Sequence, residues 1–188
     1  SETEFTTLAF VALQKNGERA FSFARKPGAD TCLKIEEIKT ELLSQCKILH
    51  VGSLSMTDEP ARGATLYAVK TAKAHGAIIS YDPNYREMLW NNKIDAMTQM
   101  RSLLPYADLI KVSEEETEML TDHEDPEQAL RYFLSKGAQI AIVTLGERGA
   151  MLGFGGICTV VPGFSVPEVV DTTGAGDAYI AAIMDSYY

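Results

Sequence analysis

The sequence predicts an α/β protein whose largely parallel sheet is flanked by helices and preceded by an N-terminal β-hairpin. From residue 31 onward, short apolar segments alternate with segments of helical periodicity. This alternation is typical of βαβ units, whose crossover connections make neighbouring strands parallel. Asn16-Gly17 lies between two short apolar runs, which is the strongest local signal of a hairpin because both turn positions need positive φ.

Composition and charge exclude several classes of protein. The 188 residues include 17 Lys and Arg against 26 Asp and Glu, a formal net charge of −9, so we expect no nucleic-acid partner, because backbone phosphates require excess basic residues. No apolar run reaches membrane-spanning length and no signal-peptide pattern opens the chain, so no membrane partner is expected. Three cysteines without a CxxC pair predict reduced thiols in a cytoplasmic protein.

The first half of the chain supplies the hairpin and two strand–helix units. Gly76 is placed to end the longer helix, because glycine readily adopts the left-handed conformation of a helix C-terminus. The predicted elements are strands at 8–13 and 20–23, a helical face of Ile35, Ile38, Leu42 and Leu43, a strand at 47–51, a helix at 59–75 and a strand at 77–81.

The second half continues the alternation. Asp125-Pro126 is an N-cap followed by proline in the first turn, and Gly137 ends the helix that it opens. The other predicted elements are a helix at 94–104, a strand at 108–112, a short helix at 114–120, a strand at 139–144, a hairpin formed by 150–152 and 159–161, and a last helix that starts within 173–176.

Polar clusters occupy four places where a strand is expected to end: 82–86, 113–116, 144–148 and 171–177. In open parallel sheets, ligands bind beyond the C-terminal ends of the strands. The four clusters therefore predict one shared cleft.

The segment 171–177 is the most informative of the four. Gly174 and Gly176 let the backbone approach a ligand closely, and the N-terminus of the following helix favours an anion such as phosphate. Asp177 then stands where a general base for an attacking hydroxyl is needed. The alternative is a glycine-rich turn whose aspartate only complements the helix dipole. A Walker A loop is excluded by the absence of any Gly-Lys pair, and Tyr179 breaks the dinucleotide fingerprint.

The other three clusters each have a structural explanation as well as a functional one. Asp82, Asn84 and Arg86 suit a polyol or a phosphate, but strand-end Asp-Pro-Asn is also good turn chemistry. Ser113 and Glu116 form a capping box, and a glutamate facing the cleft could also hold magnesium through water. The cluster that opens with Thr144 and Gly146 suits a nucleotide phosphate or a plain β-turn.

Taken together, these motifs resemble the ribokinase/PfkB carbohydrate kinase family, and within it the fructokinase-like branch. Residues 171–179 are similar to the family signature DTTGAGDAF, with Tyr179 in place of phenylalanine. Residues 82–90 resemble the DPNxRxxLW string of fructokinases, and 144–146 match the nucleotide-side TLG. Ser113 replaces the asparagine of the family's NxxE motif, and residues 23–30 resemble the segment that leads out of the substrate lid.

The resemblance implies ATP-dependent phosphorylation of a sugar's primary hydroxyl, most simply of fructose to fructose 6-phosphate. ATP and Mg²⁺ are the implied cofactors, and a monovalent cation such as K⁺ is a further one. The implied roles are Asp177 as catalytic base, Gly174, Ala175 and Gly176 as the anion hole, Ser113, Glu116, Thr144 and Gly146 on the nucleotide side, Glu116 also toward magnesium, and Asp82, Asn84, Arg86 and Arg25 toward the sugar.

The resemblance also implies a division of the chain. Residues 1–30 would form the hairpin of the substrate lid, with a homodimer contact through it, and 31–188 the kinase core. The family's N-terminal portion, with its Gly-Gly sugar motif, and its last helices find no match, so the sequence looks cut at both ends. Other acceptors (2-keto-3-deoxygluconate, ribose, a nucleoside) and an inactive fragment or binding relative stay open. A Rossmann-type oxidoreductase is disfavoured by the failed fingerprint.

Overall fold

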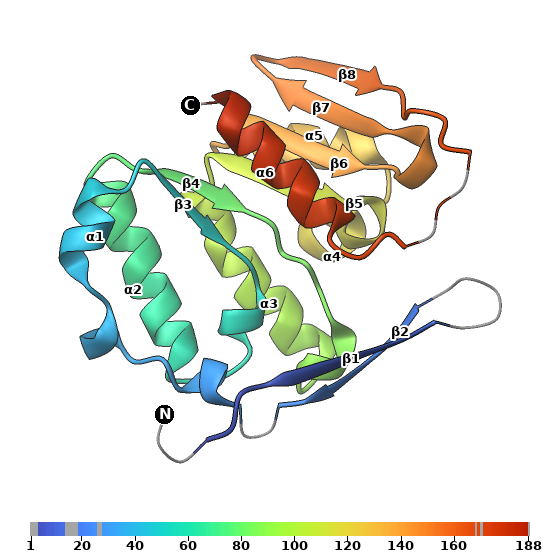
Figure 1. Cartoon of the computed structure of the whole chain (residues 1–188). Helices are drawn as coiled ribbons and strands as arrows, with labels where there is room; N and C mark the ends of the chain where they lie inside the picture. The colour runs from blue at the N-terminus through green and yellow to red at the C-terminus, as the bar shows by residue number, and fades with distance from the viewer. Residues whose placement is uncertain (1–3, 14–18, 26–27, 168, 170, 188) are drawn as a thin grey trace.

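The computed structural model describes residues 4–13, 19–25, 28–167, 169 and 171–187. It consists of a two-stranded antiparallel hairpin and an α/β body built on one six-stranded sheet (Figure 1). The predicted α/β class, with a mostly parallel sheet and an N-terminal hairpin, is confirmed.

The hairpin pairs β1 (Leu8–Leu13) with β2 (Arg19–Ala24), in a register that joins Leu8 to Ala24. The Asn16-Gly17 turn lies outside the described residues. Phe21 and Phe23 stack with their ring centroids 6.3 Å apart, whereas Phe10 of β1 is exposed. Because Phe10 pairs with Ser22, it lies on the opposite face of the hairpin from Phe21 and Phe23, so both faces carry aromatic side chains.

The sheet has the strand order β3-β4-β5-β6-β7-β8. The pairs β3–β4, β4–β5 and β5–β6 are parallel, and β6–β7 and β7–β8 are antiparallel. The bounds are β3 (Ile48–Val51), β4 (Ile78–Tyr81), β5 (Leu109–Ser113), β6 (Ile140–Thr144), β7 (Ala150–Phe154) and β8 (Ile157–Val161). Each strand lies where the sequence predicted it, and β7 and β8 extend to a Gly155-Gly156 turn with positive φ at both residues.

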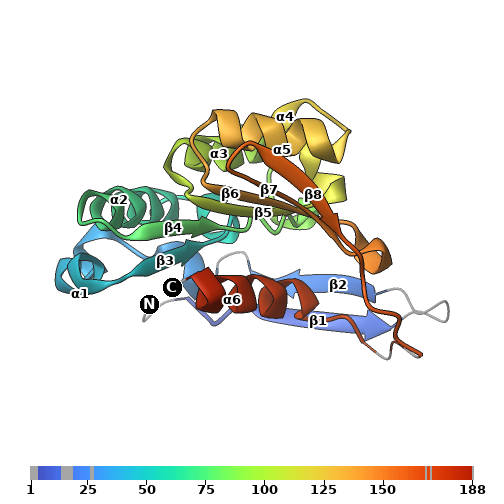
Figure 2. The same cartoon turned by 90° about the horizontal axis from the view of Figure 1, so that it is seen from above.

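Helices cover both faces of the sheet, with α2, α3, α4 and α5 on one face and α6 on the other (Figure 2). Asp125 caps α5 by accepting from the Gln128 N–H at 2.8 Å, and Gly76 and Gly137 adopt the positive φ predicted after α2 and α5. The bounds are α1 (Thr40–Gln45), α2 (Ala61–Ala74), α3 (Lys93–Leu103), α4 (Thr117–Thr121), α5 (Pro126–Ser135) and α6 (Ala175–Tyr187).

Short 3₁₀ helices connect these elements, and one of them corrects the sequence analysis. The single helical face expected from Ile35 to Leu43 is divided, because Ile38 is extended and separates a 3₁₀ turn from α1. Leu42 is 65% exposed, so this face gains little burial and lacks the packing that holds a continuous helix together. The 3₁₀ helices are η1 (Ala29–Cys32), η2 (Ile35–Glu37), η3 (Leu54–Met56), η4 (Glu87–Leu89), η5 (Leu104–Tyr106), η6 (Glu114–Glu116) and η7 (Gly146–Arg148).

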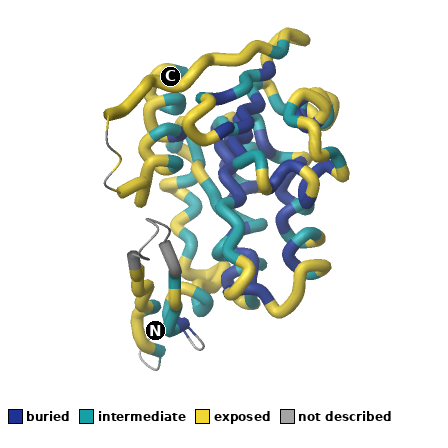
Figure 3. Tube along the Cα trace, turned by 90° about the vertical axis from the view of Figure 1, so that its right-hand side faces the viewer, coloured by how far each residue is buried: buried dark blue, intermediate teal, exposed yellow. Residues whose placement is uncertain are grey.

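The core lies between the sheet and the α2–α5 layer, while the hairpin and the segment before α6 are largely exposed (Figure 3). Tyr81 at the end of β4 is fully buried, and its hydroxyl donates to the Met100 carbonyl at 3.1 Å. Burial raises the pKa of Tyr81 well above its ordinary value. The C-terminal end of β4 is therefore firmly held, which fixes the residues that follow it.

Candidate active site

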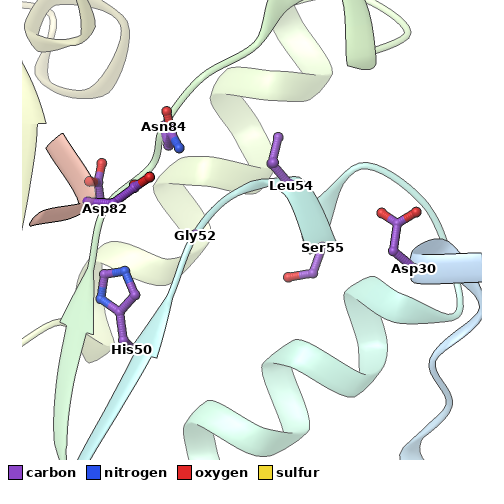
Figure 4. Close-up of a pocket in the computed structure, with 8 residues that line it drawn as sticks. Asp30, His50, Gly52, Leu54, Ser55, Asp82 and Asn84 are labelled. Atoms are coloured by element: carbon purple, nitrogen blue, oxygen red, sulfur yellow. The ribbon is translucent and has the colours of Figure 1, made fainter. Parts of the chain in front are cut away.

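A cavity of about 360 Å³ opens where β3 and β4 end and α6 begins (Figure 4). Because the first four strands of the sheet are parallel, their C-terminal ends meet at this edge. The structure brings three of the predicted site residues together in the lining: Asp82, Asn84 and Asp177. The full lining is Asp30, His50, Gly52, Leu54, Ser55, Asp82, Asn84 and Asp177.

The residues of the predicted anion site lie at the N-terminus of α6. Gly174 has φ +77 and precedes the first helical residue, and its carbonyl accepts the first helical hydrogen bond, from Ala178 at 2.8 Å. The Ala175 N–H donates to the Thr172 carbonyl at 3.1 Å, so this donor already has a partner within the loop. The N–H groups of Gly176 and Asp177 come before the first helical bond, where a helix leaves its donors for a ligand. The Asp177 side chain is exposed beside them.

An ion pair that the sequence analysis missed lies under this helix. Lys111 Nζ is 2.8 Å from Asp82 Oδ2, and the two side chains are 9% and 5% exposed. The other oxygen of Asp82, Oδ1, is buried and has no hydrogen-bond partner among the described residues. A Cβ at position 176 would lie 3.0 Å from Lys111 Nζ, so Gly176 is also needed for close packing. The sequence signal for this ion pair was Lys111 itself, a charged residue between apolar neighbours in the strand Leu109–Ser113.

Glu116 clamps two loops from a buried position. Its Oε1 accepts from the Tyr85 N–H at 2.7 Å and its Oε2 from the Ser113 N–H at 2.8 Å, which includes the predicted capping box. Burial raises the pKa of Glu116, and the two N–H donors only partly offset that effect. Glu116 thereby fixes the loop between Asp82 and Arg86, in which Asn84 has φ +48.

The donor set suits an oxygen-liking cation. Carboxylate oxygens are the ligands that Mg²⁺ prefers, usually together with several waters, and the residues Asp82 and Asp177 line one cavity. Within the described residues, no three His, Cys, Asp or Glu side chains gather as a preformed metal site. Both oxygens of Glu116 accept a backbone N–H, so an ion would reach that carboxylate through its remaining lone pairs or through water.

The residues predicted to face a nucleotide lie at the ends of β5 and β6. Ser113 and Thr144 are register partners, so the strand pairing brings them side by side. Thr144 is half-buried and its hydroxyl donates to the Val112 carbonyl at 3.3 Å, while Gly146 opens η7 with φ +62. Ser113, Thr144 and Gly146 lie outside the cavity lining, on the neighbouring part of the same sheet edge.

The two arginines predicted to contact sugar have other partners. Arg25 is 5% exposed, and its guanidinium donates to Asp30, to the Thr57 hydroxyl and to the Leu54 carbonyl. Arg86 donates to the carbonyl of the preceding residue, and its guanidinium carbon lies 5.6 Å from the centre of the Phe21 ring on β2. Neither arginine is among the residues that line the cavity.

The end of β3 contributes residues that the sequence analysis did not select. His50 Nδ1 is 3.0 Å from the Ser80 hydroxyl, and burial lowers the pKa of His50, although Asp82 and Asp177 oppose the shift. Gly52 and Ser55 follow β3 along the cavity wall. The strand-end rule that selected the other clusters applied equally to β3, and would have found these residues.

A mostly parallel sheet with a helix N-terminus and an aspartate at its C-terminal edge is typical of α/β proteins that bind a phosphate-bearing ligand. A family model described as "pfkB family carbohydrate kinase" matches residues 1–187. The chain belongs to the pfkB family of carbohydrate kinases.

Curated relatives and solved structures agree with this family. Fructokinase-1 of Zea mays is 43% identical over 180 residues, which cover 95% of this chain and 55% of that protein. Probable fructokinase-3 of Arabidopsis thaliana is 42% identical, over 95% of this chain and 52% of that protein. The chain thus spans about half the length of the curated relatives it matches.

Two solved fructokinases superpose well on this chain. The Xylella fastidiosa enzyme with bound ATP has a TM-score of 0.85 and 35% identity, and the alignment covers 96% of this chain and 56% of that one. The Vibrio cholerae enzyme, bound to fructose, ADP and a calcium ion, has a TM-score of 0.84 and 34% identity, and the alignment covers 95% of this chain and 57% of that one. Among the described residues, no helix is long and apolar enough to cross a membrane.

Proposed function

We propose that this chain carries the catalytic half of an ATP-dependent sugar kinase that converts fructose to fructose 6-phosphate. The observation that carries the proposal is the exposed Asp177 at the N-terminus of α6, in a cavity that also contains Asp82 and Asn84. The fructokinase relatives, and the related structures with ATP or with fructose and ADP, support the choice of substrates.

The proposed reaction is an in-line phosphoryl transfer. The primary hydroxyl of the sugar attacks the γ-phosphorus of ATP, so that a new O–P bond forms while the bond to the β-phosphate oxygen breaks and ADP leaves. Asp177 accepts the proton of that hydroxyl, and the N–H groups at the start of α6 stabilise the charge on the transferred group. Asp82 and Asn84 orient the sugar by hydrogen bonds to its other hydroxyls.

The nucleotide side follows from the same arrangement. Thr144 and Gly146 would lie along the ATP phosphates, next to Ser113. Mg²⁺ would neutralise phosphate charge, and Glu116 would help to hold it through water. Potassium is a further cation to test, since one related fructokinase structure contains it together with ADP and fructose.

The test is ADP release with Mg-ATP by the full reading frame that contains this sequence, over fructose, ribose, 2-keto-3-deoxygluconate and adenosine. Fructose should give the highest kcat/KM. Asp177→Asn should lower kcat by roughly 10²–10⁴-fold with little change in stability, because the side chain is exposed. Asp185→Asn, on the same helix and also exposed, is the matched control. Normal turnover in Asp177→Asn contradicts the proposal.

We further propose that residues 1–30 act as a lid on a core formed by 31–188, and that two lids pair in a homodimer. The hairpin forms a sheet of its own, and Phe5, Phe10 and Val11 on it are exposed. Burying such side chains against a second copy would remove apolar surface from water. Analytical ultracentrifugation should give a dimer that Phe10→Ser weakens, and a monomeric wild type contradicts this part.

A further inference from the structure

Lys111 contacts two parts of the proposed site, Asp82 and the first turn of α6. On one side its ammonium pairs with Asp82 Oδ2 at 2.8 Å, and on the other it lies directly under Gly176 in the first turn of α6. Asp82 Oδ1 is buried without a partner among the described residues, and Asp82 lines the cavity with Asn84 and Asp177. Asp82 Oδ2 therefore has a partner and Asp82 Oδ1 has none among the described residues. Asp82 itself belongs to the cavity wall.

Burying a lysine inside a strand costs free energy. Removing an ammonium from water costs more than packing an apolar side chain of similar volume, so stability alone favours an apolar residue here. The flanking residues Ile110 and Val112 are apolar and almost fully buried. Asp82 also faces Glu116 from η6, His50 from β3 and Asp177 from α6. Among these groups, Lys111 Nζ is the one that contacts the Asp82 carboxylate directly, at 2.8 Å.

We infer that Lys111 is a positioning residue: it pins Asp82 Oδ2 and so fixes the carboxylate in the cavity wall, where the unpartnered Oδ1 is the acceptor left for a sugar hydroxyl. The inference rests on the proposed sugar-kinase function and adds a residue to it. Without the ammonium, Asp82 Oδ2 loses its partner at 2.8 Å. The carboxylate is then free to rotate about its side-chain bonds and no longer presents a fixed acceptor to the sugar.

The test compares four proteins in the full reading frame: wild type, Lys111→Met, Asp82→Asn and the double variant. Lys111→Met should raise the KM for fructose roughly tenfold or more, because one hydrogen bond to a charged acceptor is lost, while the KM for ATP changes less than roughly threefold. Since Lys111 acts through Asp82, the double variant should show the same KM for fructose as Asp82→Asn alone.

Lys73→Met is the matched control. Lys73 pairs with Asp108 at 3.0 Å beside the opposite end of β5, so its loss should lower stability and leave both KM values unchanged. If Lys111→Met does not fold, the double variant, which removes both buried charges, supplies the fructose KM in its place. A fructose KM equal to that of wild type in either folded protein overturns the inference.

The outcomes separate the two proposals. An active wild type with an unchanged fructose KM in the Lys111 variants overturns the positioning role alone. Equal increases in the KM for fructose and for ATP also overturn it, because they indicate a general loss of structure. A wild type that releases no ADP with any sugar removes the proposed function, and this inference falls with it.

Discussion

Replacing Glu116 by alanine tests the link between stability and the site loop. The substitution leaves the part-buried N–H groups of Ser113 and Tyr85 without the carboxylate that they meet at 2.8 and 2.7 Å. Each unsatisfied buried donor costs about 1–3 kcal/mol. The variant no longer buries a carboxylate, and the avoided desolvation cost offsets part of this loss. We expect a net decrease of about 2–4 kcal/mol in the free energy of unfolding.

Urea denaturation of the full reading frame measures this loss directly. Glu116→Gln keeps one acceptor oxygen and should cost about half as much. Glu115→Ala is the control, because Glu115 is an exposed neighbour in the same 3₁₀ turn and should cost less than about 0.5 kcal/mol. A Glu116→Ala variant no less stable than Glu115→Ala refutes the assignment of the two N–H contacts as the clamp.

Glu116 also predicts a pH dependence. Because its folded-state pKa is raised above 4.5, the folded protein binds this proton more tightly than the unfolded chain. The contribution of Glu116 to stability is therefore greatest at low pH and is lost as the pH rises through the folded-state value. Subtracting the stability curve of Glu116→Gln from that of wild type should show this fall with rising pH, and a difference that grows with pH contradicts the sign.

Two more predictions follow from backbone geometry and charge. Gly149→Ala should cost at least about 2–3 kcal/mol of unfolding free energy, because φ is +98 and the new Cβ would lie 2.1 Å from the Val161 carbonyl oxygen. Gly155→Ala, with φ +54 and open space, should cost only about 1 kcal/mol, and equal costs contradict the clash. His50 should titrate below 6.5 by NMR, and lower still in Asp177→Asn, because that carboxylate raises its pKa; an unchanged titration contradicts their proximity.

Much of the fold could be predicted because local signals and tertiary structure agree. The buried parallel strand 140–144 begins with the apolar run Ile-Ala-Ile-Val, and Gly76 and Gly137 mark the helix ends. The prediction of one helical face from Ile35 to Leu43 was wrong. The apolar spacing of this segment is helical, but its surroundings leave much of it exposed. Periodicity shows which residues share a face, but whether another element covers that face depends on packing.

The site was predictable where it depends on the ends of single strands, and unpredictable where it depends on strand order. Asp82 and Lys111 are 29 residues apart, and they meet because Tyr81 pairs with Ile110 in the β4–β5 register and the next residues follow in step. His50 lies beside Ser80 for the same reason, through the β3–β4 register. A single sequence carries no signal of which strands are neighbours.

The base of the hairpin is fastened to the wall of the cavity itself. Arg25, the first residue after β2, bonds to Asp30 at 2.8 Å and to the Leu54 carbonyl at 2.7 Å, and both of these residues line the cavity. Hydrogen bonds of a single side chain thus join the hairpin to this wall. A change in the orientation of the hairpin is therefore expected to shift Asp30 and Leu54 and to alter the shape of the cavity, even when no residue that lines it has been replaced.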